Sequence, residues 1–504
     1  MIPGTLAHPL AHDSFWIDFV WAKQFTDLLR DGVLYPRWLP LSFDGLGSPA
    51  FYFYGPVAFY LCGIFGIAGL STYASILAAF GTAMIASGFA MYGCLKDKAA
   101  HALAGACLYM AAPYHLLDFY RRGALAEFTA FALLPLLALG LARAARQGRI
   151  GLLATTYALL IMTHLPTALL ASVLLVAPLS LAEYRGNGKR LLHIATGLAI
   201  GLGLAGYFLL PAILLQRHVS IDRLWLEYKF HATAWSFLHP AGWPDRDEAM
   251  LIVAATAAIA LPAALFFMLK RTFWSALTLL ICAAVAGFIP YFWSIPLLAK
   301  VQFPFRALAL AEFGIAAALA TSAIRPSILL GASLPMLTLS AFIISAPLPS
   351  GEKRLAEIVG HHPDVAEYLP AGSPVESGIT SRWAQTLAKA QPPVMIEGDR
   401  TILRRFYFPA WQARCGGRAV PIFPDQTTRL ISYRGRNCVI ERHMTQPELA
   451  GMILSLISLL LLLASRSNPL NLLETRFGQG KVTKSAAGRT TSLNLEKHRK
   501  SRGK

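Results

Sequence analysis

The chain has 504 residues, of which 55% are hydrophobic and 14% are charged, and its formal net charge at pH 7 is +18. Soluble domains carry about 25% charged residues, so this composition excludes an ordinary soluble protein. The positive charge does not indicate a nucleic-acid partner, because the Lys and Arg residues fall in short clusters between apolar runs. That arrangement is typical of proteins that cross a membrane several times.

Residues 1–70 are predicted to form an outer loop with interfacial or re-entrant helices. The apolar stretch at 51–69 is rich in Gly and aromatic residues and carries Pro56, so we interpret it as a re-entrant helix. Asp13 precedes an amphipathic aromatic stretch that also contains Asp18. A carboxylate there can act as a general base, a metal ligand or a helix N-cap, and spacing alone favours the cap.

Eleven apolar stretches are predicted to span the membrane, which makes the fold class an all-α polytopic membrane bundle. They are 71–94, 99–117, 122–143, 151–163, 167–182, 191–215, 249–269, 272–291, 303–323, 326–347 and 448–465. The bundle therefore covers residues 71–347, and the last span follows at 448–465.

The polar connections between these spans differ in charge on the two sides of the membrane. One side carries Lys96, Lys98, Arg143, Arg146, Arg149, Arg185, Lys189, Arg190, Lys270, Arg271 and Arg325. Short loops rich in Lys and Arg face the cytoplasm. The outer side then holds 1–70, 118–120, the turn at His164, 216–248, 292–302 and 349–447.

The odd number of spans places Met1 outside, because the tail after the last span lies in the cytoplasm. Either the N-terminus is translocated unaided or a first span precedes this sequence. We favour a missing first span.

Two Arg residues stand at the outer boundary, where positive charge is unusual. Arg121 and Arg122 come shortly before Glu127. Arginine suits bidentate contact with a phosphate. The alternative is an Arg–Glu ion pair that only fixes the end of the helix.

Arg306 follows Gln302 and Pro304 at the outer start of a span, where its charge needs an anionic partner. Glu312 is the internal candidate, and a lipid phosphate is the functional alternative. His164 lies at a turn between two short spans, and a lone histidine is more often a packing residue than a ligand. The sequence contains no P-loop and no dinucleotide glycine pattern, which argues against a nucleotide-driven pump.

Residues 348–447 form a polar stretch long enough for a small domain. Its second half has the strand pattern of a small β-sandwich at 401–408, 419–423, 430–433 and 437–442. Cys415 and Cys438 flank these strands on the oxidising side, which favours a disulfide over two free thiols. The basic tail at 466–504 is predicted to be disordered in the cytoplasm, close to anionic lipid.

Several short motifs in a fixed order resemble one bacterial membrane family. The motifs are His12-Asp13, LYPRW at 34–38, GLGSP at 45–49, FYFYGP at 51–56, RGALAEF at 122–128, THLP at 163–166, QFPFR at 302–306 and YFPAW at 407–411. The chain resembles the pyruvoyl-tetrahydropterin-synthase-related membrane domain family from about Asp13 to the last span. That family is similar to the GT-C class of membrane glycosyltransferases.

The resemblance implies an inverting sugar transfer on the outer face of the bacterial cytoplasmic membrane. The donor would be a polyprenyl-phosphate-linked sugar, and the acceptor an envelope glycan, lipid or protein. Asp13 matches the catalytic carboxylate that the class carries in its first outer loop. The lipid phosphate and the acceptor would be held by Arg121, Arg122, Glu127, His164, Gln302 and Arg306.

No cofactor is implied with certainty, and a requirement for a divalent cation stays open. Membrane lipids are the other expected partners, and no nucleic acid is expected. Two other functions fit the same pattern: a transporter or flippase for lipid-linked glycans, and a non-catalytic protein of envelope assembly.

Overall fold

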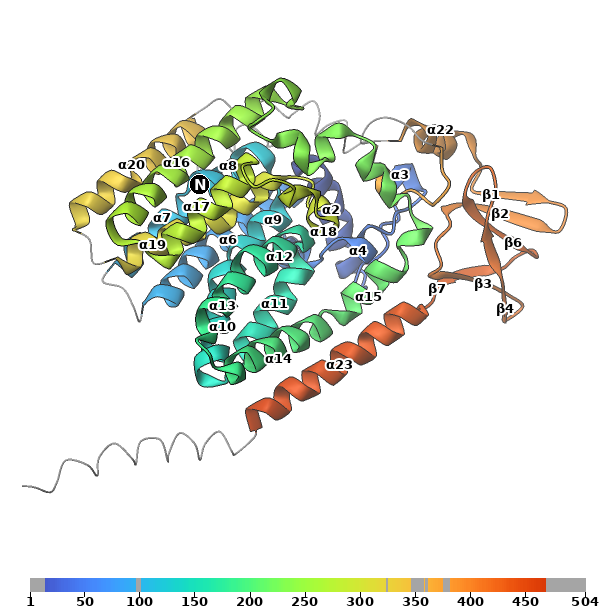
Figure 1. Ribbon diagram of the computed structural model, residues 1–504. Helices are drawn as coiled ribbons and strands as arrows, with labels where there is room; N and C mark the ends of the chain where they lie inside the picture. Colours follow the sequence, from blue (N-terminus) through green and yellow to red (C-terminus); the bar gives the residue numbers. More distant parts are fainter. Residues whose placement is uncertain are drawn as a thin grey trace, which may run out of the picture. The chain divides into compact units, whose positions relative to one another are not determined.

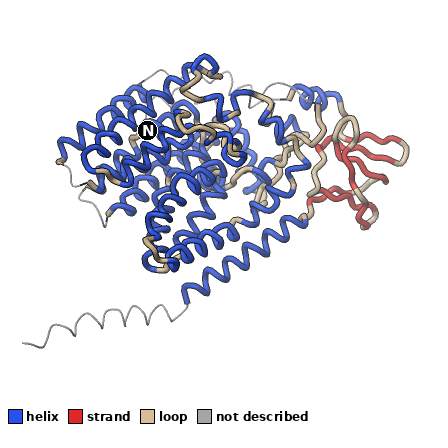
Figure 2. The backbone as a smooth tube through the Cα atoms, viewed as in Figure 1, coloured by secondary structure: helices blue, strands red, loops and turns tan. Residues whose placement is uncertain are grey.

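The structure is a computed structural model that describes residues 14–96, 101–322, 325–345, 358, 361–374 and 381–467. Asp13 and the predicted tail from residue 468 onward lie outside this part. Within it, all seven strands lie between helices α22 (Arg382–Ala390) and α23 (Gln446–Ser467), and helices and loops make up the rest (Figures 1 and 2). The contacts described below lie within Met1–Leu459.

The first described helix, α2 (Phe15–Arg30), buries most of its aromatic side chains. After α3 (Ser42–Gly45) and α4 (Ala50–Phe53), the chain breaks at Tyr54 and resumes as α5 (Val57–Ile67). Helix α5 has 11 residues. At 1.5 Å per residue it is too short to cross a bilayer alone.

Seven helical stretches in the described residues are long and apolar enough to cross a membrane. They are Thr72–Leu95 (α6), Leu125–Gln147 (α9 and α10), Leu165–Tyr184 (α12, η2 and α13), Arg246–Lys270 (α16), Pro304–Thr321 (η9 and α19), Ser327–Ser345 (within α20) and Gln446–Ser465 (within α23). The chain is therefore a mostly helical, multi-pass membrane protein. Three of these stretches combine several elements. The first consists of α9 (Leu125–Phe131) and α10 (Leu133–Gln147), and the second of α12 (Leu165–Ala171), the π-helix η2 (Ser172–Val176) and α13 (Ala177–Tyr184). The third consists of the 3₁₀ turn η9 (Pro304–Ala307) and α19 (Leu308–Thr321), whereas α20 (Pro326–Ser345) is a single helix.

The predicted count of eleven spans is not confirmed. The predicted span at 99–117 is interrupted, because α7 (Ala102–Met110) ends before α8 (Pro113–Leu117) begins. Ala112 is extended, with ψ 147°, because the residue before a proline avoids the helical conformation. Helices α11 (Gly151–Thr163) and α17 (Phe273–Ala286) are apolar but short.

The predicted span at 191–215 is a bent pair. Helices α14 (Gly188–Leu204) and α15 (Gly206–Leu214) meet at an angle of 68°. Among the described residues, the predicted outer segments at 118–120, 216–248 and 292–302, and the residues at 361–374, contain short helical elements. These are η1 (Asp118–Arg122, a π-helix), η3 (Gln216–His218), η4 (Ile221–Trp225), η5 (Tyr228–Phe230), η6 (Ala232–Trp235), η7 (Pro240–Gly242), η8 (Phe292–Ser294), α18 (Pro296–Ala299) and η10 (Ala366–Tyr368).

Two small antiparallel sheets follow α22. Their strands are β1 (Val394–Glu397), β2 (Arg400–Phe406), β3 (Trp411–Cys415), β4 (Arg418–Val420), β5 (Ile422–Pro424), β6 (Leu430–Arg434) and β7 (Val439–Arg442). One sheet has the order β1-β2-β6-β5 and the other β4-β3-β7, with Leu403 opposite Ile431 and Ala413 opposite Ile440. Ala413 packs with Ile431 and Tyr433 in one core, so the sheets share an apolar interior as in the predicted sandwich.

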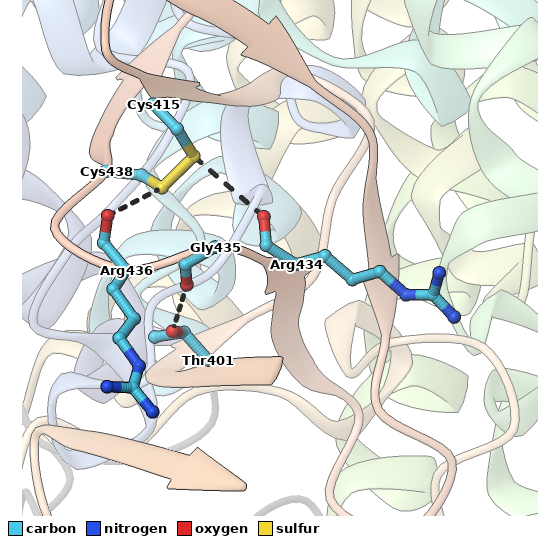
Figure 3. The surroundings of a disulfide bond; sticks show 6 residues. All are labelled: Thr401, Cys415, Arg434, Gly435, Arg436 and Cys438. Atoms are coloured by element: carbon cyan, nitrogen blue, oxygen red, sulfur yellow. Dashed lines mark hydrogen bonds between the residues drawn. A yellow bond between two sulfur atoms is a disulfide. The ribbon is translucent and has the colours of Figure 1, made fainter. Parts of the chain in front are cut away.

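A disulfide joins Cys415, the last residue of β3, to Cys438, the residue before β7 (Figure 3). Next to it, the hydroxyl of Thr401 donates to the carbonyl of Gly435 at 2.6 Å (Figure 3). The covalent bond therefore lies beside the turn between β6 and β7 and links it to the end of β3.

Buried charges connect the first loop to the start of the last helix. Arg37 is fully buried, and its Nε lies 3.2 Å from Glu448 Oε1. Arg442 at the end of β7 donates to the same oxygen at 2.7 Å. Thr445 and Glu448 form a capping box, because each side chain bonds to the other's backbone N–H.

Candidate functional site

A cavity of about 630 Å³ lies where the loops that were predicted to be outer meet the helices. Residues 14–21 of α2, the turns at 53–55 and 163–166, and the segments at 216–230, 300–306 and 365–368 contribute to its wall. Each segment contains or adjoins a stretch that charge patterning placed on the outer side. Its volume is within the range of ligand pockets, about 300–1,000 Å³.

A buried cluster of ion pairs supports one wall of this cavity. Glu127 on α9 is 1% exposed, and its Oε2 lies 2.8 Å from Arg122 Nη1 and 3.1 Å from Arg306 Nε. The hydroxyl of Tyr114 donates to Glu127 Oε1 at 2.6 Å. Asp118 is a second carboxylate for Arg122, at 2.8 Å. One carboxylate therefore holds two guanidinium groups that are 179 and 5 residues away along the chain.

Local backbone geometry brings these residues together. The π-helix Asp118–Arg122 ends at Gly123, whose φ of +58° favours glycine. A Cβ at Gly123 would also lie 2.7 Å from the Cβ of Phe15. Asp18 on α2 accepts from the backbone N–H of Leu125 at 3.1 Å, so it caps the start of α9 from another helix.

Arg306 is the member of the cluster that reaches the cavity. Its Nη1 donates to the carbonyl of Val301 at 2.8 Å and to the side chain of Gln302 at 3.2 Å. Its Cζ lies 4.8 Å from the centre of the Phe303 ring. No hydrogen bond from Arg306 Nη2 is found among the described residues.

His164 is 6% exposed and lies on the cavity wall. Its Nδ1 is 2.7 Å from the hydroxyl of Thr167, which fixes the orientation of the ring. A Cβ at Gly55 would lie 2.4 Å from the carbonyl oxygen of Met162, so the first loop packs against the backbone just before His164. The two motifs therefore shape the same wall.

A short segment at 364–368 closes another side of the cavity. Trp21 Nε1 donates to Asp364 Oδ1 at 3.1 Å, and the Tyr368 ring stacks on Phe53 at 5.9 Å. Glu367, the residue before Tyr368 in the chain, lines the cavity. Burial raises the pKa of Asp364 to about 6. Burial, together with the nearby Asp364 and Glu227 carboxylates, raises the pKa of Glu367 to about 7.

Three further charged residues line the cavity. Arg223 Nη2 donates to the backbone carbonyl of Ser373 at 2.6 Å. Lys300 Nζ lies 4.1 Å from the centre of the Trp225 ring. Glu227 forms an ion pair with a neighbouring lysine at 2.9 Å. The cavity thus combines guanidinium and ammonium groups with carboxylates.

The structure brings most of the predicted site residues together. Arg122, Glu127 and Arg306 form the buried cluster, and Gln302 and His164 line the cavity beside it. Arg121 is half-buried and does not line the cavity. Asp13 is outside the described residues, but Ser14, to which it is bonded, lines the cavity.

The proposed pairing of Arg306 with Glu312 is wrong. Glu312 accepts from the backbone N–H groups of Tyr114 at 2.5 Å and His115 at 3.2 Å, at the start of α8. It therefore serves as a cap for that helix. Glu127 takes its place as the partner of Arg306.

No sequence pattern indicated the roles of Asp364 and Glu367, because isolated acidic residues in a polar segment carry no recognisable motif. Glu227 and Lys300 lie in predicted outer loops with several aromatic residues, and that composition was the available signal. In the part of the chain that the structure describes, no group of three or more His, Cys, Asp or Glu side chains is arranged to hold a metal ion.

Comparison with known protein families identifies the family of this chain. The family model of the 6-pyruvoyl-tetrahydropterin synthase related domain, described as a membrane protein, matches residues 51–350. No curated protein and no solved structure matches the chain. The matched region includes Arg122, Glu127, His164 and Arg306 and covers more than half of the sequence. The chain therefore belongs to the 6-pyruvoyl-tetrahydropterin synthase related domain family of membrane proteins.

Proposed function

We propose that this protein is a membrane glycosyltransferase that moves a sugar from a polyprenyl-phosphate-linked donor to an envelope acceptor. The reaction would take place on the outer face of the bacterial cytoplasmic membrane. The observation that carries the proposal is the cavity with Arg306 fixed on its wall. The resemblance to the GT-C class supplies the reaction type, and the pterin chemistry in the family's label is no part of it.

Arg306 is suited to hold the leaving phosphate. Its Nε and Nη1 are occupied by Glu127 and the backbone of Val301, so the side chain is oriented before a ligand binds. A donor held in advance where negative charge develops stabilises the transition state without reorganisation. Hydrogen bonds between charged groups are stronger than neutral ones, which favours a phosphate as the ligand.

The chemistry that follows is a single displacement. An acceptor hydroxyl oxygen attacks the anomeric carbon, and the bond from that carbon to the phosphate oxygen breaks. The electron pair leaves with the phosphate near Arg306, and a cavity carboxylate takes the proton of the hydroxyl. Asp13 is the carboxylate that the resemblance implies. His164 and Gln302 would orient the donor or the acceptor.

A transporter or flippase for a lipid-linked glycan is the second candidate. A transporter would carry charged residues along a path through several spans. Among the described spans, the buried Glu127 and Arg306 pair with each other, and Glu312 is used as a helix cap. These pairings favour a site at one end of the helices over a continuous path.

The test compares envelope glycans from cells with and without the gene by mass spectrometry. We expect one sugar to disappear in the deletion and to return with the unaltered protein. Arg306→Gln should fail to restore it, whereas Arg434→Gln, at an 89% exposed side chain, should restore it fully. An unchanged glycan profile in the deletion would refute the proposal. Accumulation of the complete glycan on the inner leaflet would favour the flippase.

A further inference from the structure

Glu367 is held at a defined place on the cavity wall by its neighbours in the chain. It belongs to η10 (Ala366–Tyr368), whose other two side chains are buried. Before it, Asp364 is anchored to Trp21. After it, the carbonyl of Leu369 accepts from the backbone N–H of Ser220 at 2.9 Å. The segment is therefore fixed on both sides of Glu367.

The carboxylate of Glu367 differs from that of Glu127 in its surroundings. Glu127 lies between two guanidinium groups. For Glu367, no ion pair or side-chain hydrogen bond is found within the described ranges, and the donor that acts on it is its own backbone N–H. The charged groups that affect it are carboxylates, Asp364 and Glu227. Within the part of the chain that the structure describes, Glu367 is therefore not a member of a structural ion pair.

The cavity thus has two chemically different parts. Arg306 presents a guanidinium that is already neutralised in part by Glu127 and faces the cavity. Glu367 presents a carboxylate for which no ion pair is found among the described residues, on a different element. A displacement reaction needs these two functions, since one group must hold the leaving phosphate and another must take a proton.

The proton affinity of the Glu367 carboxylate suits the role of a proton acceptor. Burial and the nearby carboxylates raise the pKa of Glu367 to about 7. A general base is most effective when its pKa lies near the working pH, because it is then both deprotonated and basic. A solvated aspartate, with a pKa of about 3.9, is a much weaker base.

We propose that Glu367, in the extracytoplasmic domain, is the proton acceptor of the transfer. Its carboxylate takes the proton of the acceptor hydroxyl as the oxygen bonds to the anomeric carbon. The bond to phosphate breaks, and its electron pair leaves with the phosphate beside Arg306. This inference rests on the proposed function, and it assigns to Glu367 the role that the resemblance implies for Asp13.

The test uses Glu367→Gln, which keeps the shape of the side chain but cannot accept the proton. The protein is expressed in cells that lack the gene, and the appearance of the restored glycan after induction is followed by mass spectrometry. We expect a loss of about 10²- to 10⁴-fold. Glu397→Gln, at an exposed position on β1, is the matched control and should leave the rate unchanged.

The dependence on external pH tests whether the proton acceptor titrates near pH 7. With Glu367 as the base, the rate should rise as the pH increases and level off above about 7, because the carboxylate must be deprotonated. A base with the pKa of a solvated aspartate would give a constant rate between about pH 5.5 and 8. Full activity of Glu367→Gln, or a constant rate over this range, would overturn the assignment.

A second measurement does not depend on activity. Dicyclohexylcarbodiimide modifies protonated carboxyl groups in apolar surroundings, and peptide mass spectrometry locates the product. In membranes that contain the whole protein, labelling at Glu367 should fall by half near pH 7. Absence of labelling at any pH would overturn the position that we assign to this side chain. A different outcome is that Glu367 is labelled as expected but deletion of the gene leaves the envelope glycans unchanged. That result would refute the proposed function and, with it, the catalytic role of Glu367.

Discussion

Replacing Glu127 with glutamine removes one negative charge from the centre of the buried cluster while keeping the size of the side chain. The carboxylate receives Arg122 at 2.8 Å, Arg306 at 3.1 Å and the Tyr114 hydroxyl at 2.6 Å. A glutamine has one acceptor oxygen, and its NH₂ group would face donors. At least one guanidinium therefore loses its charged partner.

The size of the effect follows from burial. Removing one partner of a buried ion pair costs about 3–5 kcal/mol, because the remaining charge stays uncompensated. Arg122 keeps Asp118 at 2.8 Å, so the loss falls mainly on Arg306. We therefore expect the lower end of the range, about 3 kcal/mol.

An exposed pair in the same chain provides the control. The side chains of Arg414 and Glu441 are 48% and 44% exposed. Exposed pairs contribute about 0–1 kcal/mol, so Glu441→Gln should be nearly neutral. Thermal unfolding of the whole protein in detergent should show a clearly lower midpoint for Glu127→Gln than for Glu441→Gln. Equal midpoints would refute the description of the cluster as a buried, mutually dependent network.

Three further predictions concern packing, cross-linking and pH. Gly55→Ala should lower the midpoint of thermal unfolding, because the new Cβ would lie 2.4 Å from the carbonyl oxygen of Met162. Gly93→Ala is the control and should leave the midpoint unchanged, because nothing lies within 4 Å of its Cβ. Equal midpoints for the two variants would contradict the close packing at Gly55. Cys415→Ser removes the disulfide and should destabilise the β-sheet region by about 2–4 kcal/mol. This region should then be cleaved more readily in limited proteolysis. An unchanged digestion pattern would contradict a structural role for the disulfide. The raised pKa of Asp364 means that the folded state binds more protons than the unfolded state between about pH 4 and pH 6. The free energy of unfolding should therefore fall as the pH rises through this range, by about 3 kcal/mol in total. Asp364→Asn should reduce this slope, and an equal slope in both proteins would refute the raised pKa of Asp364.

The general architecture could be predicted from the sequence because it follows from apolar length and charge pattern. Seven of the predicted spans coincide with helices long enough to cross a membrane. The interruptions were harder to recognise. The break at Ala112 and the bend between α14 and α15 lie within continuous apolar runs, where hydropathy alone does not show them.

Within the site, the residues were easier to predict than their partners. Arg306 needed an anion, but Glu312 is six positions further along the helix, whereas side chains three or four apart share a face. The true partner, Glu127, is 179 residues away, and only the tertiary packing brings it close. Strand β3 was also missed, because the turns on either side of Trp411–Cys415 dominate its pattern.

The most direct test of the central claim is to detect the product that every such transfer releases. The whole protein is reconstituted in liposomes with a panel of polyprenyl-phosphate-linked sugars and a membrane extract as the source of acceptor. Free polyprenyl phosphate is then measured by mass spectrometry. We predict release that depends on the protein with at least one sugar, is lost in Arg306→Gln and is retained in Arg434→Gln. No release with any donor, or equal release by Arg306→Gln, would contradict the account.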